Sequence, residues 1–195
     1  MINNIKILRQ KIISCQKCPR LVSFRKKIAA EKRKSFQNWE YWGKPVPGFG
    51  NINSKIMILG LAPAAHGANR TGRVFTGDKS ADFLFQSLFE TSLSNIPSSE
   101  NKNDGLILNA YMTVAVKCVP PGDKPSVLEK ANCETYLNNE LAILDSIKVI
   151  VGLGKIAFDA VLKNIRKNYP ILMKDFPFRH GARYLLPNKI ALYAS

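Results

Sequence analysis

The feature that most constrains this chain is an apolar run, residues 55–59, that leads directly into a loop of small, glycine-rich and polar residues, 60–78. The run predicts a buried strand of a parallel sheet, and residues 81–91 after the loop predict a helix. Ligands of open α/β sheets bind at the carboxyl ends of strands. We therefore expect a binding site in this loop, which we call the motif loop.

The rest of the chain continues the alternation of strands and helices. Strands are predicted at 111–116, 148–151 and 190–193, and helices at 5–14, 21–36, 126–147 and 154–168. Residues 37–53 and 93–105 predict loops, the second of them on the surface. Alternation of this kind implies a parallel sheet between helices. We predict one α/β domain, residues 1–195, built as a three-layer α/β/α sandwich with a short central parallel sheet.

The charge balance points to a polyanionic partner. The chain has 29 Lys and Arg against 14 Asp and Glu, a net charge of +15, which favours nucleic acid. Basic residues crowd between Lys17 and Lys34; a solvated helix face or an anionic membrane surface are the alternatives, and no strongly apolar face supports the membrane. No stretch is apolar enough to span a bilayer or to serve as a signal peptide. We expect a cytoplasmic protein.

Four cysteines leave several alternatives open. Cys15 and Cys18 form a C-x2-C pair, and Cys118 and Cys133 follow far along the chain. Disulfides are rare in intracellular proteins. Four thiolates suffice for a zinc site or an iron–sulfur cluster, and four unrelated buried cysteines are also compatible with this spacing.

Two features of the strand–loop–helix units have plain structural explanations. Residues 152–157, Gly-Leu-Gly-Lys-Ile-Ala, fit a dinucleotide-binding pattern, but close backbone packing at a strand-to-helix turn explains them better. In the motif loop, Phe75 is either a core residue or an exposed aromatic face. Asp78 is placed to cap the following helix, an interaction worth about 1 kcal/mol, and capping is compatible with a catalytic role.

Residues 60–78 closely resemble motif 1 of the family 5 (type-5) uracil-DNA glycosylases, a branch of the uracil-DNA glycosylase superfamily. The resemblance covers nearly the whole chain in the order of that family. It extends to Cys15–Val22, Tyr41–Trp42, Pro45–Gly50, Ala115–Pro121, Val149–Ala157 and Phe178–Ala182.

The resemblance implies a uracil-DNA glycosylase-like fold and a monofunctional enzyme of base excision repair. Such an enzyme flips uracil, and some other deaminated bases, out of DNA and removes them by hydrolysis. By resemblance, Phe75 stacks on the extruded base. Asp78 is the family's candidate for positioning or activating the attacking water, and its carboxylate also stabilises the cationic sugar.

Other residues of the predicted site follow from the same resemblance. Gly60, Ala62 and Pro63 belong to the base pocket, and Ala62 stands where other branches carry an acid or amide, so we expect a less polar, more permissive pocket. Asp123 stands where relatives often carry an asparagine, and an ionised aspartate accepts hydrogen bonds but donates none. Further candidates for contacts to phosphate or the base edge are His66, Asn69 and Arg70.

The resemblance also implies a cofactor. It assigns Cys15, Cys18, Cys118 and Cys133 to a 4Fe-4S cluster with a structural role. The expected partner is uracil-containing DNA, double- or single-stranded, bound by a monomer. Family members continue beyond the position of Ser195 with a histidine motif and a closing helix, so we expect that the C-terminal end is missing. The alternative is a non-catalytic iron–sulfur DNA-binding protein derived from a glycosylase.

Overall fold

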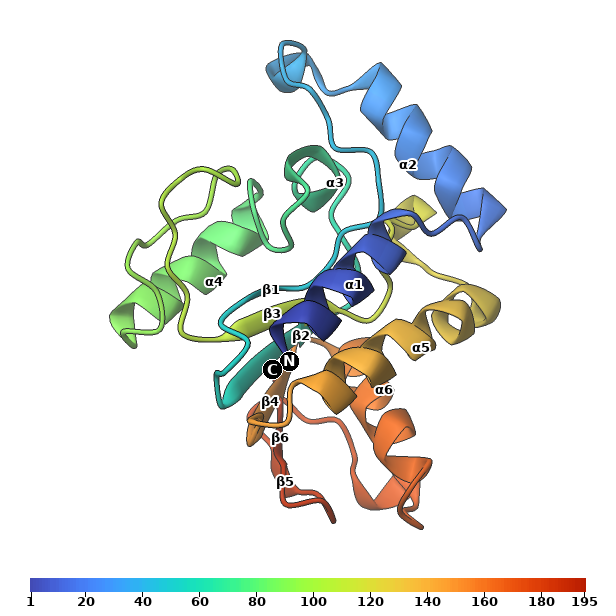
Figure 1. The fold of residues 1–195 in the computed structure, drawn as a ribbon, viewed down its shortest axis with the longest axis vertical. Helices are drawn as coiled ribbons and strands as arrows, with labels where there is room; N and C mark the ends of the chain where they lie inside the picture. Colours follow the sequence, from blue (N-terminus) through green and yellow to red (C-terminus); the bar gives the residue numbers. More distant parts are fainter.

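The computed structural model describes all 195 residues, and a single six-stranded sheet of order β1-β3-β2-β4-β6-β5 forms its centre (Figure 1). The four inner strands, β3, β2, β4 and β6, are parallel to one another. The edge strands pair antiparallel. In chain order the strands are β1 (Phe49–Gly50), β2 (Ile56–Gly60), β3 (Tyr111–Val114), β4 (Val149–Gly152), β5 (Arg183–Leu185) and β6 (Ala191–Ala194).

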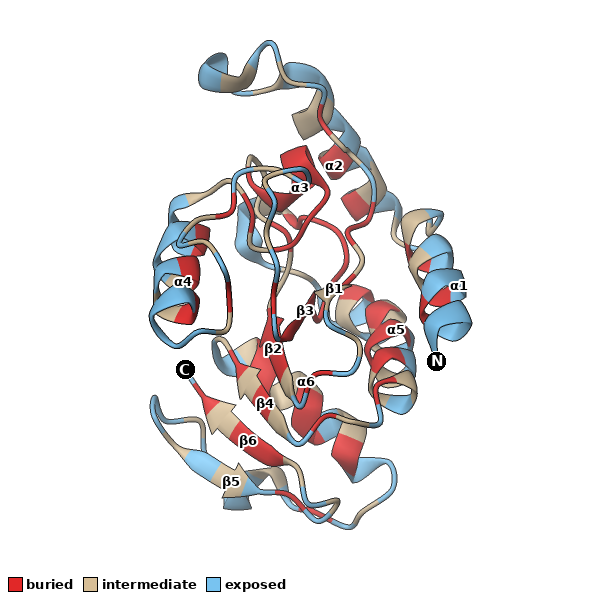
Figure 2. Cartoon of the chain, turned by 60° about the vertical axis from the view of Figure 1, so that its left-hand side comes forward, coloured by how far each residue is buried: buried red, intermediate tan, exposed pale blue.

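The helices form layers on the two faces of this sheet. Figure 2 shows α1, α5 and α6 on one side and α4 on the other, while α2 projects from the body. The predicted α/β/α sandwich is therefore confirmed. The helices are α1 (Ile2–Ile13), α2 (Pro19–Glu31), α3 (Ala68–Thr71), α4 (Lys79–Glu90), α5 (Val127–Ile143) and α6 (Lys155–Arg166), with short 3-10 turns at Lys34–Phe36, Pro121–Asp123 and Met173–Asp175.

Two apolar cores hold the layers together. The larger core lies between the sheet and α1, α5 and α6, and it includes Ile150, Phe158 and Leu192. The smaller core lies under α4, with Phe85 and Met112 fully buried. The inner strands are buried on both sides where helices cover both faces, which is why their sequences are continuously apolar.

Local sequence signals explain several boundaries. Ser126 caps α5 through a capping box with Glu129. Gly152 packs so closely on α6 that a Cβ would lie 2.9 Å from Phe158 Cα, which confirms the packing explanation of this glycine pattern. The basic helix predicted at 21–36 is wrong in its length: α2 ends at Glu31, and Lys32 has a left-handed φ of 54°.

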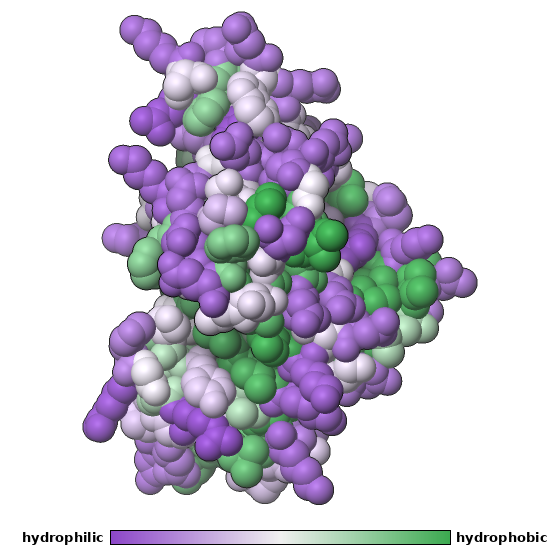
Figure 3. Space-filling view, turned by 90° about the vertical axis from the view of Figure 1, so that its left-hand side faces the viewer, coloured by the Kyte–Doolittle hydropathy of each residue, from purple (hydrophilic) through white to green (hydrophobic).

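The α4 side of the sheet is covered over only part of its width. Side chains of β4, β6 and β5 on this side, including Val149, Val151 and Tyr193, are only half-buried, and Leu185 is exposed. Figure 3 views this side and shows apolar surface along its middle and lower parts. None of the helices is long and apolar enough to cross a membrane.

Candidate active site at the motif loop

The motif loop leaves β2 at the predicted position, the carboxyl end of a central strand. Its first residues stay attached to the neighbouring strand, because Ala115 N donates to Gly60 O at 2.9 Å and Val116 N donates to Leu61 O at 2.9 Å. The loop then forms the short helix α3, which ends at Gly72 with φ +73°. A left-handed residue of this kind reverses the chain, and glycine adopts it without strain.

Phe75 lies directly against the end of β2. Its φ is +50°, an unusual conformation for a side-chain-bearing residue, and its ring packs on Gly60 so closely that a Cβ there would lie 2.6 Å from Phe75 Cζ. The ring is half-buried. Because Gly60 has no side chain, the Phe75 ring can pack against the carboxyl end of β2. A flat ligand could stack on the ring at this edge of the sheet.

Asp78 is the N-cap of α4, and its two carboxylate oxygens have different surroundings. Oδ1 accepts a hydrogen bond from Ala81 N at 3.0 Å, so the predicted helix cap is confirmed. Oδ2 lies against the backbone of Gly67, where a Cβ would approach it to 2.1 Å. One oxygen thus stabilises the helix while the other faces the motif loop.

His66 is held by a residue outside the motif loop. Its Nδ1 lies 3.0 Å from the hydroxyl of Tyr41. Burial lowers the pKa of His66, and the positive charges of Arg33 and Arg70 lower it further. The imidazole is therefore neutral at pH 7, since its pKa lies below the ordinary value of about 6.5.

Arg70 is a structural clamp that sequence patterns do not reveal. Its Nε donates to His66 O at 2.7 Å and its Nη2 donates to Gly77 O at 2.9 Å. Its guanidinium carbon lies 3.9 Å from the ring centroid of Phe36 and 4.0 Å from that of Trp39. Burial lowers the pKa of Arg70, while Tyr41 and Asp78 raise it. Arg70 thereby ties both ends of the motif loop to the aromatic turn after α2.

The other predicted pocket residues differ in accessibility. Asn69 is fully buried and its Nδ2 donates to Arg25 O at 3.3 Å, while its Oδ1 has no hydrogen-bond partner; its contact with substrate stays a prediction. Pro63 is buried and Ala62 half-buried. Asp123 is exposed, with φ +57°, and its side chain makes no hydrogen bond within the protein, so its role also stays a prediction.

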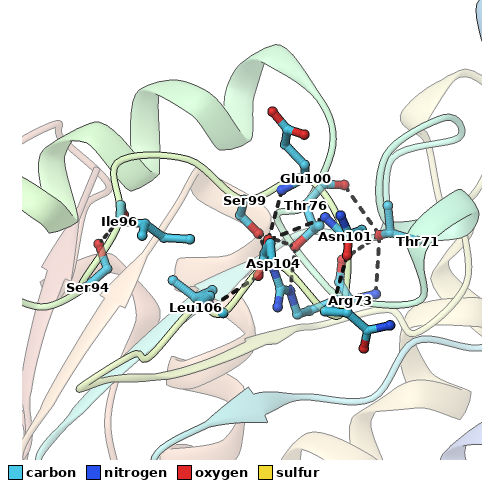
Figure 4. Close-up of polar contacts among 12 residues, drawn as sticks. Thr71, Arg73, Thr76, Ser94, Ile96, Ser99, Glu100, Asn101, Asp104 and Leu106 are labelled. Atoms are coloured by element: carbon cyan, nitrogen blue, oxygen red, sulfur yellow. Dashed lines mark hydrogen bonds and ion pairs between the residues drawn. The ribbon is translucent and has the colours of Figure 1, made fainter.

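The surface loop predicted at 93–105 is confirmed, and some of its buried side chains also support the motif loop (Figure 4). Arg73 donates to Thr76 Oγ1 at 3.0 Å and to Ser99 Oγ at 2.7 Å, and it pairs with Asp104. Gly77 N donates to Ser99 O at 2.7 Å. These partners are buried or nearly so. The network fixes the backbone just before Asp78, and no local sequence signal predicts it.

The four cysteines gather in one region, which we call the cysteine shoulder (Cys15, Cys18, Cys118, Cys133 and the helix starts of α2 and α5). All four are free thiols. Cys118 and Cys133 are buried with Leu21 and Val116, and Cys18 packs on them. Burial raises the pKa of Cys118 to about 12; Arg25 lowers it and the other three cysteines raise it, so all four sulfurs share one neighbourhood.

Hydrogen bonds and an ion pair close the cysteine shoulder. Lys117 N donates to Cys133 Sγ at 3.5 Å, and Arg20 binds Glu129 through two bonds of 2.8 and 2.7 Å, joining the start of α2 to the start of α5. No three His, Cys, Asp or Glu side chains lie close enough to hold one metal ion. Ala62 of the motif loop packs against this cluster, so the two regions adjoin.

A cavity of about 190 Å³ lies elsewhere, between α5 and α6. Its lining includes Val116, Leu137 and Ile156 but none of the predicted site residues. The predicted catalytic and substrate-binding residues therefore lie outside this cavity, in the motif loop and at Asp123.

Comparison with known proteins agrees with this geometry. Residues 47–190 match the model of the uracil DNA glycosylase superfamily. The chain is 43% identical over 186 residues to a type-5 uracil-DNA glycosylase of Thermus thermophilus, covering 95% of this chain and 83% of that protein. The chain belongs to the type-5 uracil-DNA glycosylases of this superfamily.

Other type-5 uracil-DNA glycosylases match over shorter spans. That of Pyrobaculum aerophilum is 47% identical over 154 residues, 78% of this chain and 67% of that protein. That of Mycobacterium bovis is 48% identical over 151 residues, 76% and 56% respectively. The superfamily match begins at residue 47 and so does not include Cys15 and Cys18. The match to the Thermus protein covers 186 of the 195 residues. Because 14 residues precede Cys15, that match must extend over Cys15 and Cys18. Likeness to the type-5 enzymes therefore includes the cysteine shoulder.

Proposed function

We propose that this type-5 uracil-DNA glycosylase removes uracil from DNA by hydrolysis of the N-glycosidic bond, as the first step of base excision repair. Water oxygen bonds to the sugar C1′, the C1′–N1 bond breaks, and the electron pair leaves with uracil, which gains a proton. The observation that carries the proposal is that the motif loop sets the Phe75 ring against Gly60 at the carboxyl end of β2 and, three residues later, leaves one oxygen of Asp78 outside its helix cap.

Phe75 and Asp78 have complementary roles in this reaction. The extruded base stacks on the half-buried Phe75 ring, because a base lifted from the helix needs an aromatic surface to replace its neighbours. Asp78 Oδ2 positions the attacking water and stabilises the cationic sugar that forms as the bond breaks. Its other oxygen stays bonded to Ala81 N, which holds the carboxylate in place without reorganisation during the reaction.

The wall of the pocket is apolar where Ala62 stands. A methyl group makes no hydrogen bond to the base edge, so it does not distinguish uracil from other deaminated bases of similar size. We extend the proposed substrate range to such bases. Arg70 and the Arg73 network support the reaction indirectly by fixing the motif loop just before Asp78.

A 4Fe-4S cluster held by Cys15, Cys18, Cys118 and Cys133 is part of the proposal. The chemistry of the donor set fits, because four free thiols lie in one region and Cys18 packs on the buried Cys118 and Cys133. A cluster spans a wider ligand set than one zinc ion does. When bound, the cluster would cross-link the N-terminal segment that carries Cys15 and Cys18 to the α/β domain that carries Cys118 and Cys133. No step of base removal passes through the cluster.

The test is uracil release from an oligonucleotide duplex with one U·G pair, measured under single-turnover conditions. Asp78→Asn keeps a good helix cap but removes the carboxylate charge, and we expect it to slow release by about 10²- to 10⁴-fold. Asp82→Asn is the matched control, since Asp82 is an exposed acid in the first turn of the same helix. An unchanged rate in Asp78→Asn would overturn the role of Asp78. DNA binding with no release by the native chain would replace the proposal with the non-catalytic alternative.

A further inference from the structure

Trp42 lies beside the motif loop in a fixed position. Its backbone N donates to Arg70 O at 2.9 Å, and the next residue, Gly43, donates to Asn69 O at 3.0 Å. The indole Nε1 donates to Pro45 O at 3.1 Å. The ring packs on Gly72, where a Cβ would lie 2.7 Å from Trp42 Cδ2. The indole is thus a rigid platform at the edge of the loop that carries Phe75.

Two lysines share this platform. Lys102 Nζ lies 3.6 Å from the centroid of the Trp42 ring and Lys44 Nζ lies 5.4 Å from it. Lys102 comes from the 93–105 segment and Lys44 from the segment before β1, so folding brings the two together. Each ammonium group gains a cation–π contact with the indole.

No carboxylate neutralises these two ammonium groups. Neither lysine takes part in any of the six ion pairs of the protein, and the nearby acid Asp104 is already paired with Arg73. The pKa of Lys102 is lowered, first by partial burial and then by the charges of Lys44 and Arg73. Like charges held together on a rigid ring repel one another, and a bound anion relieves that repulsion.

We infer that Lys44 and Lys102, held on Trp42, bind a phosphodiester of the DNA backbone next to the extruded base. This inference rests on the proposed function for the presence of DNA. Both lysines are exposed to solvent and therefore accessible to a duplex. A phosphate contact fixes the register of the protein on DNA without reading sequence, which is what a loop that receives one flipped base requires.

The first test is the salt dependence of DNA binding by the double variant Lys44→Met/Lys102→Met. Methionine keeps the unbranched stem and removes the charge. We expect weaker binding at low salt, and a slope of log K against log salt that is smaller by about 0.9 for each lost phosphate contact. The loss should be equal for undamaged and uracil-containing duplexes. Lys6→Met/Lys11→Met removes the same charge from two exposed positions of α1 and should leave the slope close to native.

The second test uses Trp42 as a reporter. Trp39 and Trp42 are the two tryptophans of the chain, so Trp39→Phe leaves Trp42 emission alone. Titration with undamaged duplex should change this emission in the Trp39→Phe background and leave it unchanged when Lys44 and Lys102 are methionine. A response to inorganic phosphate but not to duplex would overturn the DNA assignment in favour of a free anion.

The outcomes separate this inference from the proposed function. A lysine pair variant with native salt slope would overturn the subsite, even if uracil release were intact. A native chain that binds DNA through the lysine pair but releases no uracil would overturn the glycosylase proposal and leave the subsite standing.

Discussion

The motif loop and the cysteine shoulder adjoin at Ala62, yet their polar groups are used differently. In the shoulder, charged side chains form ion pairs within the protein. Arg20 pairs with Glu129. Behind them Lys117 pairs with Glu140 at 2.8 Å, and the side chains of Lys117 and Glu140 are each about 1% exposed. In the motif loop, Asp78 keeps one oxygen outside its helix cap, and the flanking Lys44 and Lys102 are unpaired. This difference agrees with the proposal that the shoulder serves folding and the loop serves binding and chemistry.

The largest expected effect falls on the shoulder. Cys133→Ser should abolish the proposed cluster, because a cluster that forms only in the folded chain contributes its binding energy to folding. We expect loss of iron, loss of the visible absorbance and a strongly lowered Tm, with iron analysis and calorimetry as the measurements. Ser126→Ala, which removes only a helix cap of the same helix, is the control. A stable, fully active Cys133→Ser protein without iron would break the comparison.

The second effect concerns the buried ion pair behind the shoulder. Lys117 Nζ also donates to Thr113 Oγ1 at 2.6 Å, and Thr113 donates to Glu140. Lys117→Met alone leaves a buried carboxylate without its cation and should cost about 3–5 kcal/mol. Lys117→Met/Glu140→Leu should restore much of that loss, as urea denaturation would reveal. Equal destabilisation of the single and double variants would show that the loss of stability does not come from the unpaired charge of Glu140.

The third effect is on the motif loop and on activity more than stability. Gly60→Ala places a methyl group against the Phe75 ring and should displace it. Base stacking on an aromatic ring is worth about 1–3 kcal/mol, so kcat/KM for uracil release should fall by about 5- to 150-fold. Phe75→Leu should cause a similar loss, and the double variant should add little to either. Additive losses would mean that Gly60 acts by some route other than Phe75.

The smallest effect is a pH dependence of stability from His66. Its pKa is lowered in the folded protein, by burial first and then by Arg33 and Arg70. The unfolded chain therefore binds the proton more readily. This contribution to the free energy of unfolding is fully present above about pH 6.5 and decreases as the pH falls through the range down to the folded pKa. His66→Gln should flatten that part of the profile in urea titrations. A profile unchanged by the substitution would remove His66 from the pH response.

The sequence by itself determined the order of the four parallel strands and of the longer helices, the position of the motif loop and the cap at Asp78, but not the antiparallel edge strands β1 and β5. Each of these depends on neighbouring residues: continuous apolar runs, small residues after a strand, an acid at the first turn of a helix. The tertiary structure decided which distant residues support that loop. The sequence presents Arg70 as a candidate for contact with phosphate or the base edge, and only the fold packs it between Phe36 and Trp39. Arg73 meets Ser99 and Asp104 only across the fold. Lys117 belongs to a charged class that is rarely buried, and only its pairing with Glu140 places it in the core. Contacts between residues far apart in sequence carry no local periodicity, so they are settled by packing alone.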